Sequence, residues 1–323
     1  MTTIIQQLKL LRMAPTAKQK TNTIYQFPSY HHKVSASDPH PSQHAISPNH
    51  SLSEVRLKVL AVRIHRIVRS RASGTHYSTS TLPHIPVIDG VVTDPSGKLV
   101  YFASMQIGTL ASHVNMPKHA VWPLQQGVGP VQVAASINPA MTRTTGLRKG
   151  FTYLILGATS ASGGLAVTLA RALGAGTVIR AARNEVALQA LGLDRLIVIK
   201  EIVEDTDFTS LEDVDVVLDY VYGPLALHLF QSLKTPKSVQ YVHIGSLSGT
   251  MKVAVPGEIL RSKDLTIRGS GQGAWAMEAF VQTIEELLLY VPSLPEQEVE
   301  VSKFGDLEEG WGYSGPKKLD FVS

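Results

Sequence analysis

The stretch LILGATSASGGLAVTLARALGA, residues 154–175, joins a short apolar run, a turn of small residues and a segment rich in alanine and leucine. The apolar run predicts a buried strand, and the segment that starts near Ser162 predicts a helix. Gly157 permits a tight turn, and Gly163 lets the helix pack closely on the strand. The first amides of such a helix lack partners within it and carry partial positive charge, so a phosphate fits there. The stretch therefore predicts a strand–turn–helix unit that binds a dinucleotide.

In the middle of this turn, Ser160 stands where the usual G-x-G-x-x-G motif has a second glycine. A serine Cβ obstructs the close approach of a phosphate slightly, but the hydroxyl can donate a hydrogen bond to it. We expect Ser162 to cap the helix, and we expect a site that is altered and not abolished. The alternative is that the small residues serve packing alone. The residues predicted to bind the dinucleotide here are Gly157, Ala158, Thr159, Ser160, Ser162 and Gly163.

Helices and apolar strands alternate in the chain around this turn. Strands rich in Val, Ile and Leu with helices between them are typical of a parallel sheet covered on both faces. A last strand within 264–273 and an amphipathic helix over 276–290 are predicted, whereas residues 291–323 show too little pattern to assign. The other predicted elements are a helix over 131–147, the strand 153–157, the helix 163–174, the strand 177–182, the helix 184–191, the strands 195–199 and 214–221, the helix 224–233 and the strand 238–245.

Residues 54–124 show a different pattern, of short strands separated by Pro and Gly turns. Within 54–64, apolar and polar side chains alternate from Val55 to Ala61, as in a half-buried strand. Many short strands without long helices predict a compact β-barrel-like domain. The fold class is therefore α/β, with a doubly wound parallel sheet and a second, strand-rich domain.

The bulk composition narrows the function classes. The chain has 323 residues, a formal net charge of +4 and no cysteine. Without cysteine, disulfides, thiolate nucleophiles and sulfur-ligated zinc are excluded. The basic residues are scattered and form no stripe interleaved with aromatics, so we expect no nucleic-acid partner. No apolar run reaches the roughly 18 residues that cross a bilayer, so we expect no membrane partner.

The N-terminus is basic and has no acidic residue before Asp38. We expect a cytoplasmic protein with an irregular N-terminal extension. A mitochondrial transit peptide is the alternative, because such peptides are amphipathic, basic and poor in acidic residues.

The end of the second strand of the α/β domain indicates which dinucleotide binds. NAD usually requires Asp or Glu there, to accept from the ribose 2′-hydroxyl. Here Ala181 and Ala182 are followed by Arg183 and Asn184, and a guanidinium suits a 2′-phosphate. We therefore expect NADP(H), held by Arg183 and Asn184, with Arg180 as a second candidate. The alternative is that Arg183 only begins the next helix.

Together these features resemble the medium-chain dehydrogenase/reductase (MDR) superfamily, and within it the zinc-free quinone oxidoreductase-like, or enoyl reductase-like, branch. In that branch the turn and helix usually read GATGxxGxxAVQxAKxLGA, against GATSASGGLAVTLARALGA here. The resemblance covers residues 52–275. It is also carried by the segments VRSRASGTHYS (68–78), LPHIPVIDGVV (82–92), VDVVLDYVYG (214–223), VHIGSLSG (242–249) and LRSKDLTIRGSGQG (260–273).

The resemblance implies a Rossmann domain that binds NADP and an N-terminal GroES-like β-barrel domain completed by the C-terminal segment. We place an extension with part of a first hairpin at 1–50, the GroES-like substrate domain at 51–126, the Rossmann domain at 127–275, and the segment that returns to the substrate domain at 276–323. Homodimers are common in the family, and the resemblance leaves a homodimer open. Zinc members of the superfamily use Cys and a Gly-His-Glu element, so the resemblance implies that this chain uses no metal.

The resemblance also implies a reaction in which NADPH passes a hydride to a quinone or an α,β-unsaturated carbonyl, a small-molecule substrate. In the family the loop at 68–78 lies at the substrate cleft. There Tyr77 is the candidate donor to the substrate carbonyl, and Arg69 and Arg71 are candidate anchors; packing and solvent-exposed roles are the alternatives. The residues that the resemblance places toward the nicotinamide half are Asn138, Gly245, Ser246 and Gly271.

Three departures from the family pattern bear on activity. Ser160 replaces the turn glycine, Val87 stands where the family more often has glycine, and the first hairpin, expected before residue 52, is hard to recognise. Ser160 and the uncertain hairpin motivate a second hypothesis: a catalytically inactive nucleotide-binding relative that acts as a redox sensor or structural protein.

Overall fold

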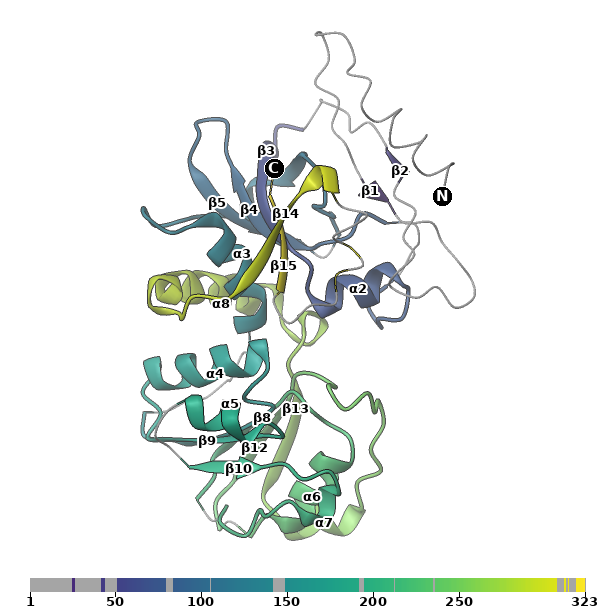
Figure 1. Ribbon diagram of the computed structural model, residues 1–323, viewed down its shortest axis with the longest axis vertical. Helices are drawn as coiled ribbons and strands as arrows, with labels where there is room; N and C mark the ends of the chain where they lie inside the picture. Colours follow the sequence, from purple (N-terminus) through teal and green to yellow (C-terminus); the bar gives the residue numbers. More distant parts are fainter. Residues whose placement is uncertain are drawn as a thin grey trace. The chain divides into compact units, whose positions relative to one another are not determined.

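The computed structural model describes residues 25–26, 42–43, 51–79, 84–104, 106–141, 149–191, 195–211, 213–234, 236–306, 311, 313 and 318–322 (Figure 1). The chain divides into two compact units. Unit 1 comprises Met1–Pro123 together with Val299–Ser323, and unit 2 comprises Leu124–Glu298.

Unit 1 is built on a seven-stranded sheet in the order β14-β15-β3-β4-β5-β7, with β6 paired to the first half of β3. All neighbours are antiparallel except β14 and β15. Because β15 pairs with β3, the C-terminal segment completes this sheet, as predicted. The strands are β3 Glu54–Arg63, β4 Asp89–Thr93, β5 Leu99–Ala103, β6 His113–Pro117, β7 Val121–Pro123, β14 Val299–Lys303 and β15 Lys318–Val322.

The core of unit 1 forms around β3. Its side chains Leu57, Val59 and Val62 are fully buried and share one apolar cluster with Phe102. Helix α2, Arg66–Ala72, follows β3 and buries one residue in the same cluster. Earlier in the sequence, β1 Tyr25–Gln26 pairs antiparallel with β2 Ser42–Gln43. The first hairpin was expected before residue 52, and the other residues of 1–50 lie outside the described residues.

Val87 adopts a backbone conformation that favours glycine, with φ +68°. The loop is held in place because the amide of Thr109 donates to the carbonyl oxygen of Val87 at 3.1 Å. A β-branched residue in the left-handed region costs on the order of 1–2 kcal/mol. The buried Val87 side chain offsets this cost by packing in the core of unit 1. Valine in place of glycine at position 87 therefore strains this loop, and its side chain adds to the packing of the core.

Unit 2 is a six-stranded sheet in the order β10-β9-β8-β11-β12-β13. Every pairing is parallel, which confirms the predicted doubly wound sheet. The strands are β8 Thr152–Leu156, β9 Thr177–Ala182, β10 Leu196–Val198, β11 Val216–Asp219, β12 Val239–His243 and β13 Leu265–Gly269. The helices are α3 Pro130–Ala140, α4 Ala161–Ala172, α5 Glu185–Ala190, α6 Pro224–Ser232, α7 Gly257–Ser262 and α8 Met277–Tyr290.

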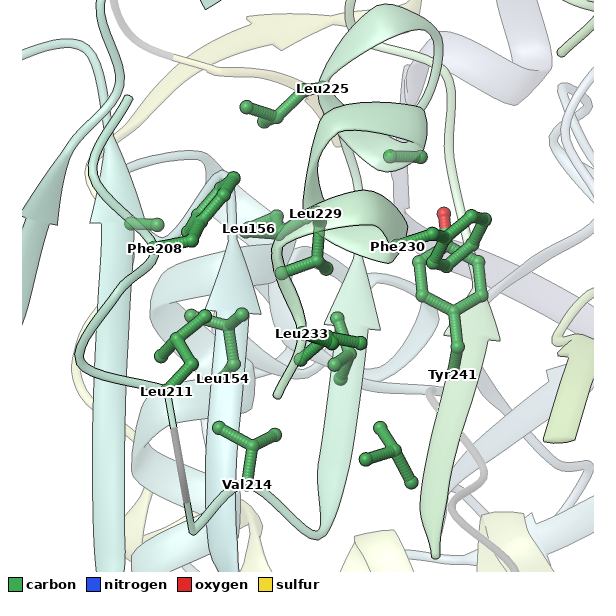
Figure 2. Packing of buried hydrophobic residues seen from close by; sticks show 14 of the residues in the cluster. Leu154, Leu156, Phe208, Leu211, Val214, Leu225, Leu229, Phe230, Leu233 and Tyr241 are labelled. Atoms are coloured by element: carbon green, nitrogen blue, oxygen red, sulfur yellow. The ribbon is translucent and has the colours of Figure 1, made fainter. Parts of the chain in front are cut away.

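Helices cover both faces of this sheet, because its strands are apolar on both sides. One cluster joins β8, β9 and β11 to α4 and α5. The other, drawn in part in Figure 2, joins Leu154 and Leu156 of β8 to Leu229 and Phe230 of α6. The ring of Phe230 meets the ring of Tyr241 edge-on at 4.7 Å between centroids, an arrangement that aromatic pairs prefer.

The boundary of unit 2 differs from the expected one. We expected residues 276–323 to return to the substrate domain, but the structure keeps residues up to Glu298 in unit 2. The reason is that α8 packs on α3 of the same unit. Ile284 and Leu287, on the apolar face of α8, are buried. An amphipathic pattern predicts a helix but not the core that it covers.

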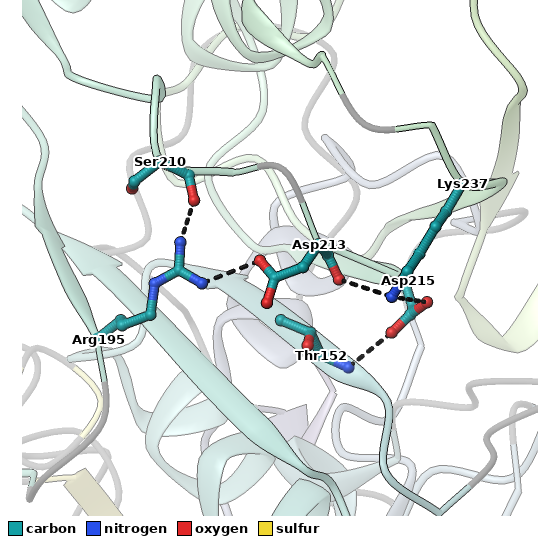
Figure 3. Close-up of polar contacts among 6 residues, drawn as sticks. All are labelled: Thr152, Arg195, Ser210, Asp213, Asp215 and Lys237. Atoms are coloured by element: carbon teal, nitrogen blue, oxygen red, sulfur yellow. Dashed lines mark hydrogen bonds and ion pairs between the residues drawn. The ribbon is translucent and has the colours of Figure 1, made fainter.

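A polar network joins the amino ends of the strands of unit 2 (Figure 3). The carboxylate of Asp215 accepts from the amide of Thr152 at 2.8 Å and lies 3.4 Å from the ammonium of Lys237. Arg195 donates to Asp213 at 2.9 Å and to the carbonyl oxygen of Ser210. The side chains of Arg195 and Asp213 are 39% and 47% exposed, so that pair contributes about 1 kcal/mol or less. Asp215 is more buried than its partner Lys237. The network lies at the end of the sheet opposite to the glycine turn.

Candidate functional site

The strand order of unit 2 reverses at β8. From β8 the chain builds β9 and β10 on one side, then β11, β12 and β13 on the other. In open parallel sheets, ligands bind outside the carboxyl ends of the strands at such a reversal. The glycine turn that follows β8 lies at this point, so the fold places the predicted dinucleotide motif where a ligand crevice is expected.

The turn after β8 depends on its glycines. Gly157 has φ +86°, which strains any other residue. A Cβ on Gly163 would stand 2.2 Å from the carbonyl oxygen of Gly157 and 2.9 Å from the Cα of Ala158. The helix α4 therefore packs directly on the turn, as predicted, and no larger residue fits at Gly163 without a backbone shift.

The cap of α4 is Ser160, and not Ser162 as we predicted. The helix begins at Ala161, and the Ser160 hydroxyl oxygen accepts from the amide of Gly163 at 3.1 Å. The prediction was two residues late because the small side chains of this turn do not mark where helical geometry starts. The amides of Ala161 and Ser162 donate to no other described residue, and the Ser160 hydroxyl keeps its proton for a further bond.

The end of β9 separates the two candidate arginines. Arg180 is fully buried and donates to the carbonyl oxygen of Leu188 at 3.2 Å, so it cannot reach a 2′-phosphate in solvent. Arg183 follows β9 directly and its side chain is exposed. Asn184 caps α5, because its side-chain oxygen accepts from the amide of Ala187 at 3.0 Å. Of these side chains, only that of Arg183 is both exposed and positively charged.

A buried carboxylate, which sequence reasoning missed, shapes the turn after β11. Asp219 accepts from the amides of Val221 and Tyr222 at 2.6 and 2.9 Å and from the hydroxyl of Tyr241. Burial raises the pKa of Asp219, and burial beside Asp219 raises the pKa of Tyr241. These bonds hold Tyr222 at φ +61°. An aspartate at the end of an otherwise apolar strand was the signal that could have pointed to this role.

Two of the segments predicted to meet the nicotinamide half, those of Gly245–Ser246 and of Gly271, lie at the same edge of the sheet. The amide of Gly245 donates to the carbonyl oxygen of Asp219 at 3.2 Å, and Ser246 follows. A Cβ on Gly157 would lie 3.5 Å from Leu247, so this segment adjoins the glycine turn. Gly271 follows β13, at the carboxyl end of that strand.

Asn138 lies within α3 and is not placed at this edge by any described contact. Its carbonyl oxygen accepts from the amide of Met141 at 3.2 Å. Asn138 therefore stays a prediction.

In unit 1, the two candidate anchors hold parts of that unit together. Arg69 donates to the carbonyl oxygens of Trp311 and Tyr313 at 2.5 and 3.0 Å. Arg71 donates to the hydroxyl of Ser78 at 2.7 Å. Arg71 therefore braces the loop that carries Tyr77, whereas Arg69 joins α2 to the segment that holds Trp311 and Tyr313.

Tyr77 itself is 74% exposed. Its ring lies 4.2 Å from that of His76, whose Nδ1 lies 2.8 Å from the Ser78 hydroxyl. Burial, and then the charge of Arg71, lower the pKa of His76. The phenol of Tyr77 thus projects from a loop whose neighbouring side chains are hydrogen-bonded.

Among the described residues, no group of three or more His, Asp or Glu side chains is placed to hold a metal ion. No helix that the structure describes combines the length and apolarity of a membrane span.

No family model matches the chain. The chain is 32% identical over 292 residues to a protein of Emericella nidulans named "Probable NADPH-dependent quinone reductase tdiC", and the match covers 74% of this chain and 82% of that protein.

Solved structures share the fold. The quinone oxidoreductase of Thermus thermophilus, solved also with NADPH, is 23% identical, with 93% of this chain and 100% of that chain covered and a TM-score of 0.74. Quinone oxidoreductase of Escherichia coli with NADPH is 17% identical, with 94% and 100% covered and a TM-score of 0.74. These likenesses confirm the predicted combination of a Rossmann domain and a GroES-like domain. With the 32% identity over most of both sequences, they show that the chain belongs to the quinone oxidoreductase-like branch of the medium-chain dehydrogenase/reductase superfamily.

Proposed function

We propose that this chain is an NADPH-dependent, metal-independent oxidoreductase that transfers a hydride to a quinone or an α,β-unsaturated carbonyl. The observation that carries the proposal is the turn after β8, where Gly163 packs on Gly157 at the reversal of the strand order. The name of the Emericella nidulans relative supports the same activity. The name of this relative does not favour the alternative of a catalytically inactive nucleotide-binding protein.

The residues at the turn fit a dinucleotide. The amides of Ala161 and Ser162 and the hydroxyl proton of Ser160 are donors suited to a diphosphate at the start of a helix. Arg183 suits the 2′-phosphate that distinguishes NADPH from NADH, because a guanidinium binds phosphate through two parallel hydrogen bonds. Bound NADPH would supply the hydride.

The reduction of a quinone needs a proton as well as a hydride. Hydride transfer converts the quinone to the hydroquinone anion, and a proton from a phenol or from water completes the hydroquinone. A hydrogen-bond donor near the substrate oxygen stabilises the charge that develops on it. We propose Tyr77 for this role, since its phenol is exposed, and we propose Arg71 as the positioning residue of its loop.

The test is turnover with a panel of acceptors. The chain is incubated with NADPH and a series of quinones, enones and alkenals, and the loss of reduced-nicotinamide absorbance is followed. We expect turnover with at least one acceptor class, and we expect Tyr77→Phe to lower kcat while the dissociation constant for NADPH stays unchanged. Saturable NADPH binding without turnover on any acceptor would favour the redox sensor instead.

A further inference from the structure

The loop that follows α2 closes on itself around Tyr77. The amides of Thr75 and His76 both donate to the carbonyl oxygen of Ser70, at 2.9 and 3.1 Å. The amide of Thr79 donates to the carbonyl oxygen of His76 at 2.9 Å. These bonds fix the backbone on both sides of Tyr77. The phenol itself forms no hydrogen bond with a described residue, so the backbone alone does not determine where its hydroxyl points.

The bonds around His76 determine which of its ring nitrogens carries the proton. The amide of Ser78 donates to Nδ1 at 3.2 Å, and because an amide N–H only donates, Nδ1 is an acceptor. The hydroxyl of Ser78 lies 2.8 Å from the same nitrogen, and it accepts from the guanidinium of Arg71 at 2.7 Å. The hydroxyl proton therefore points at Nδ1. These bonds require a neutral imidazole with its proton on Nε2.

A second proton on this imidazole would break the arrangement. A proton on Nδ1 would face the amide and the hydroxyl of Ser78, which both donate, so two hydrogen bonds would be lost. The guanidinium of Arg71 and the phenol of Tyr77 are the titratable groups that the described contacts place around this ring. Burial, and then the positive charge of Arg71, lower the pKa of His76. The neutral ring is therefore the form present at neutral pH.

The neutral ring of His76 supports Tyr77. The two ring centroids lie 4.2 Å apart, with the planes at 33°. Tyr77 is otherwise exposed, so the imidazole is the surface against which its ring rests. Ordering an exposed side chain costs rotamer entropy, and contact between the two flat rings offsets part of that cost. The direction of the phenol therefore depends on the plane of His76, which the bonds from Ser78 set.

We propose that His76 is a positioning residue for Tyr77, with Arg71 and Ser78 holding its imidazole in the neutral form that carries the proton on Nε2. The imidazole keeps the phenol in the direction from which it donates to the substrate oxygen. Tyr77 should then donate well only while His76 is neutral. This inference rests on the proposed function, because His76 acts through the donor that we propose there.

The first test examines the tautomer and needs no turnover. Long-range ¹H–¹⁵N correlation spectra of the histidine rings are recorded at neutral pH, with His76→Ala to assign the signals. We expect the Nε2–H tautomer for His76, and we expect the other tautomer to appear once Ser78→Ala has removed the hydroxyl. A His76 ring with its proton on Nδ1, or a charged ring at this pH, would overturn the inference and leave the proposed function standing.

The second test is the pH profile of kcat with a quinone that the acceptor panel shows to be reduced. In the wild type kcat should fall at acid pH, with a midpoint below the ordinary histidine pKa of 6.5, because charged His76 releases Tyr77. His76→Ala should lower kcat about tenfold with KM nearly unchanged, and it should abolish the acid limb. His113→Ala is the matched control: Nδ1 of His113, on β6, also lies beside a serine hydroxyl, that of Ser112 at 3.3 Å, and this variant should keep the limb.

The double variant His76→Ala/Tyr77→Phe separates an action through Tyr77 from a general structural effect. We expect its kcat to equal that of Tyr77→Phe alone, since the direction of the phenol does not matter once its hydroxyl is gone. Losses that multiply in the double variant, or an acid limb that persists in His76→Ala, would overturn the inference alone. A Tyr77→Phe variant with the kcat of the wild type would overturn the proposed role of Tyr77 together with it.

Discussion

Gly163 lies directly on Gly157: a Cβ on Gly163 would stand 2.2 Å from the carbonyl oxygen of Gly157. This contact joins the first turn of α4 to the end of β8, so that the free amides of the helix meet the carboxyl edge of the sheet. The proposed cofactor site depends on that approach more than on the number of glycines in the motif, since Ser160 is accommodated as the helix cap.

The first prediction follows from this contact. Gly163→Ala should lower the free energy of unfolding by about 1–3 kcal/mol, because the added methyl group forces the helix away from the turn. Chemical denaturation measures the change, and a nucleotide titration should show weaker NADPH binding. Gly164→Ala is the matched control, since its Cβ would meet its nearest neighbour, the carbonyl oxygen of Ala158, at an ordinary 3.8 Å. Equal behaviour of the two variants would show that the close approach is not required.

The second prediction separates the two serines of the turn. Ser160→Ala should cost about 1 kcal/mol of stability, because the amide of Gly163 loses its capping oxygen. Ser162→Ala should change stability by only a few tenths of a kcal/mol, because Ser162 is not the cap. Urea unfolding of both variants measures the difference. A larger loss of stability in Ser162→Ala than in Ser160→Ala would mean that Ser162 is the helix cap, as the sequence predicted.

Local sequence patterns were enough to predict most helices and strands. Features that depend on contacts between distant residues could not be predicted from them. The strand–turn–helix at 154–175 was predictable because its glycines act on their own neighbours. The role of Tyr222 was not, because its left-handed backbone depends on the buried carboxylate of Asp219 and on His243, 21 residues away. Likewise, the amphipathic pattern of 276–290 predicted α8 without indicating that unit 2 holds it.

The third prediction measures the strain at Tyr222. At φ +61° a glycine is unstrained, whereas alanine is not. Tyr222→Gly should therefore be more stable than Tyr222→Ala by about 1 kcal/mol, the reverse of the order in a helix interior. Both variants lose the contact with the His243 ring, so the comparison isolates the backbone term. An alanine variant as stable as the glycine variant would mean that the turn relaxes out of the left-handed region.

The fourth prediction concerns Asp219 and Tyr241. Burial raises the pKa of Asp219 above its ordinary value of 3.8, so the native state holds this proton more tightly than the unfolded chain does. Its stabilising contribution is complete below the ordinary pKa and is lost as the pH rises through the raised value. The hydroxyl of Tyr241 favours the carboxylate and offsets part of that loss.

Tyr241→Phe removes this donor. The variant should lose about 1–3 kcal/mol of stability at neutral pH, where the carboxylate loses a hydrogen bond, and less as the pH falls and Asp219 becomes protonated. Denaturation curves at several pH values measure the trend. Tyr153→Phe is the control, since the Tyr153 hydroxyl, in the same sheet, has no hydrogen bond to any described residue and its loss should show no such pH dependence. If Tyr241→Phe lost the same stability at every pH, the hydroxyl of Tyr241 would not act through the ionised carboxylate of Asp219.

The dissociation constants of NADPH and NADH, measured by fluorescence titration in the wild type and in Arg183→Glu, test the central claim most directly. We expect the wild type to bind NADPH more tightly than NADH, and we expect Arg183→Glu to lose affinity for NADPH at least about tenfold more than for NADH, since a bidentate phosphate contact is replaced by repulsion. Equal losses for the two nucleotides would take Arg183 out of the phosphate site. Failure of the wild type to bind either nucleotide would contradict the assignment of the β8 turn itself.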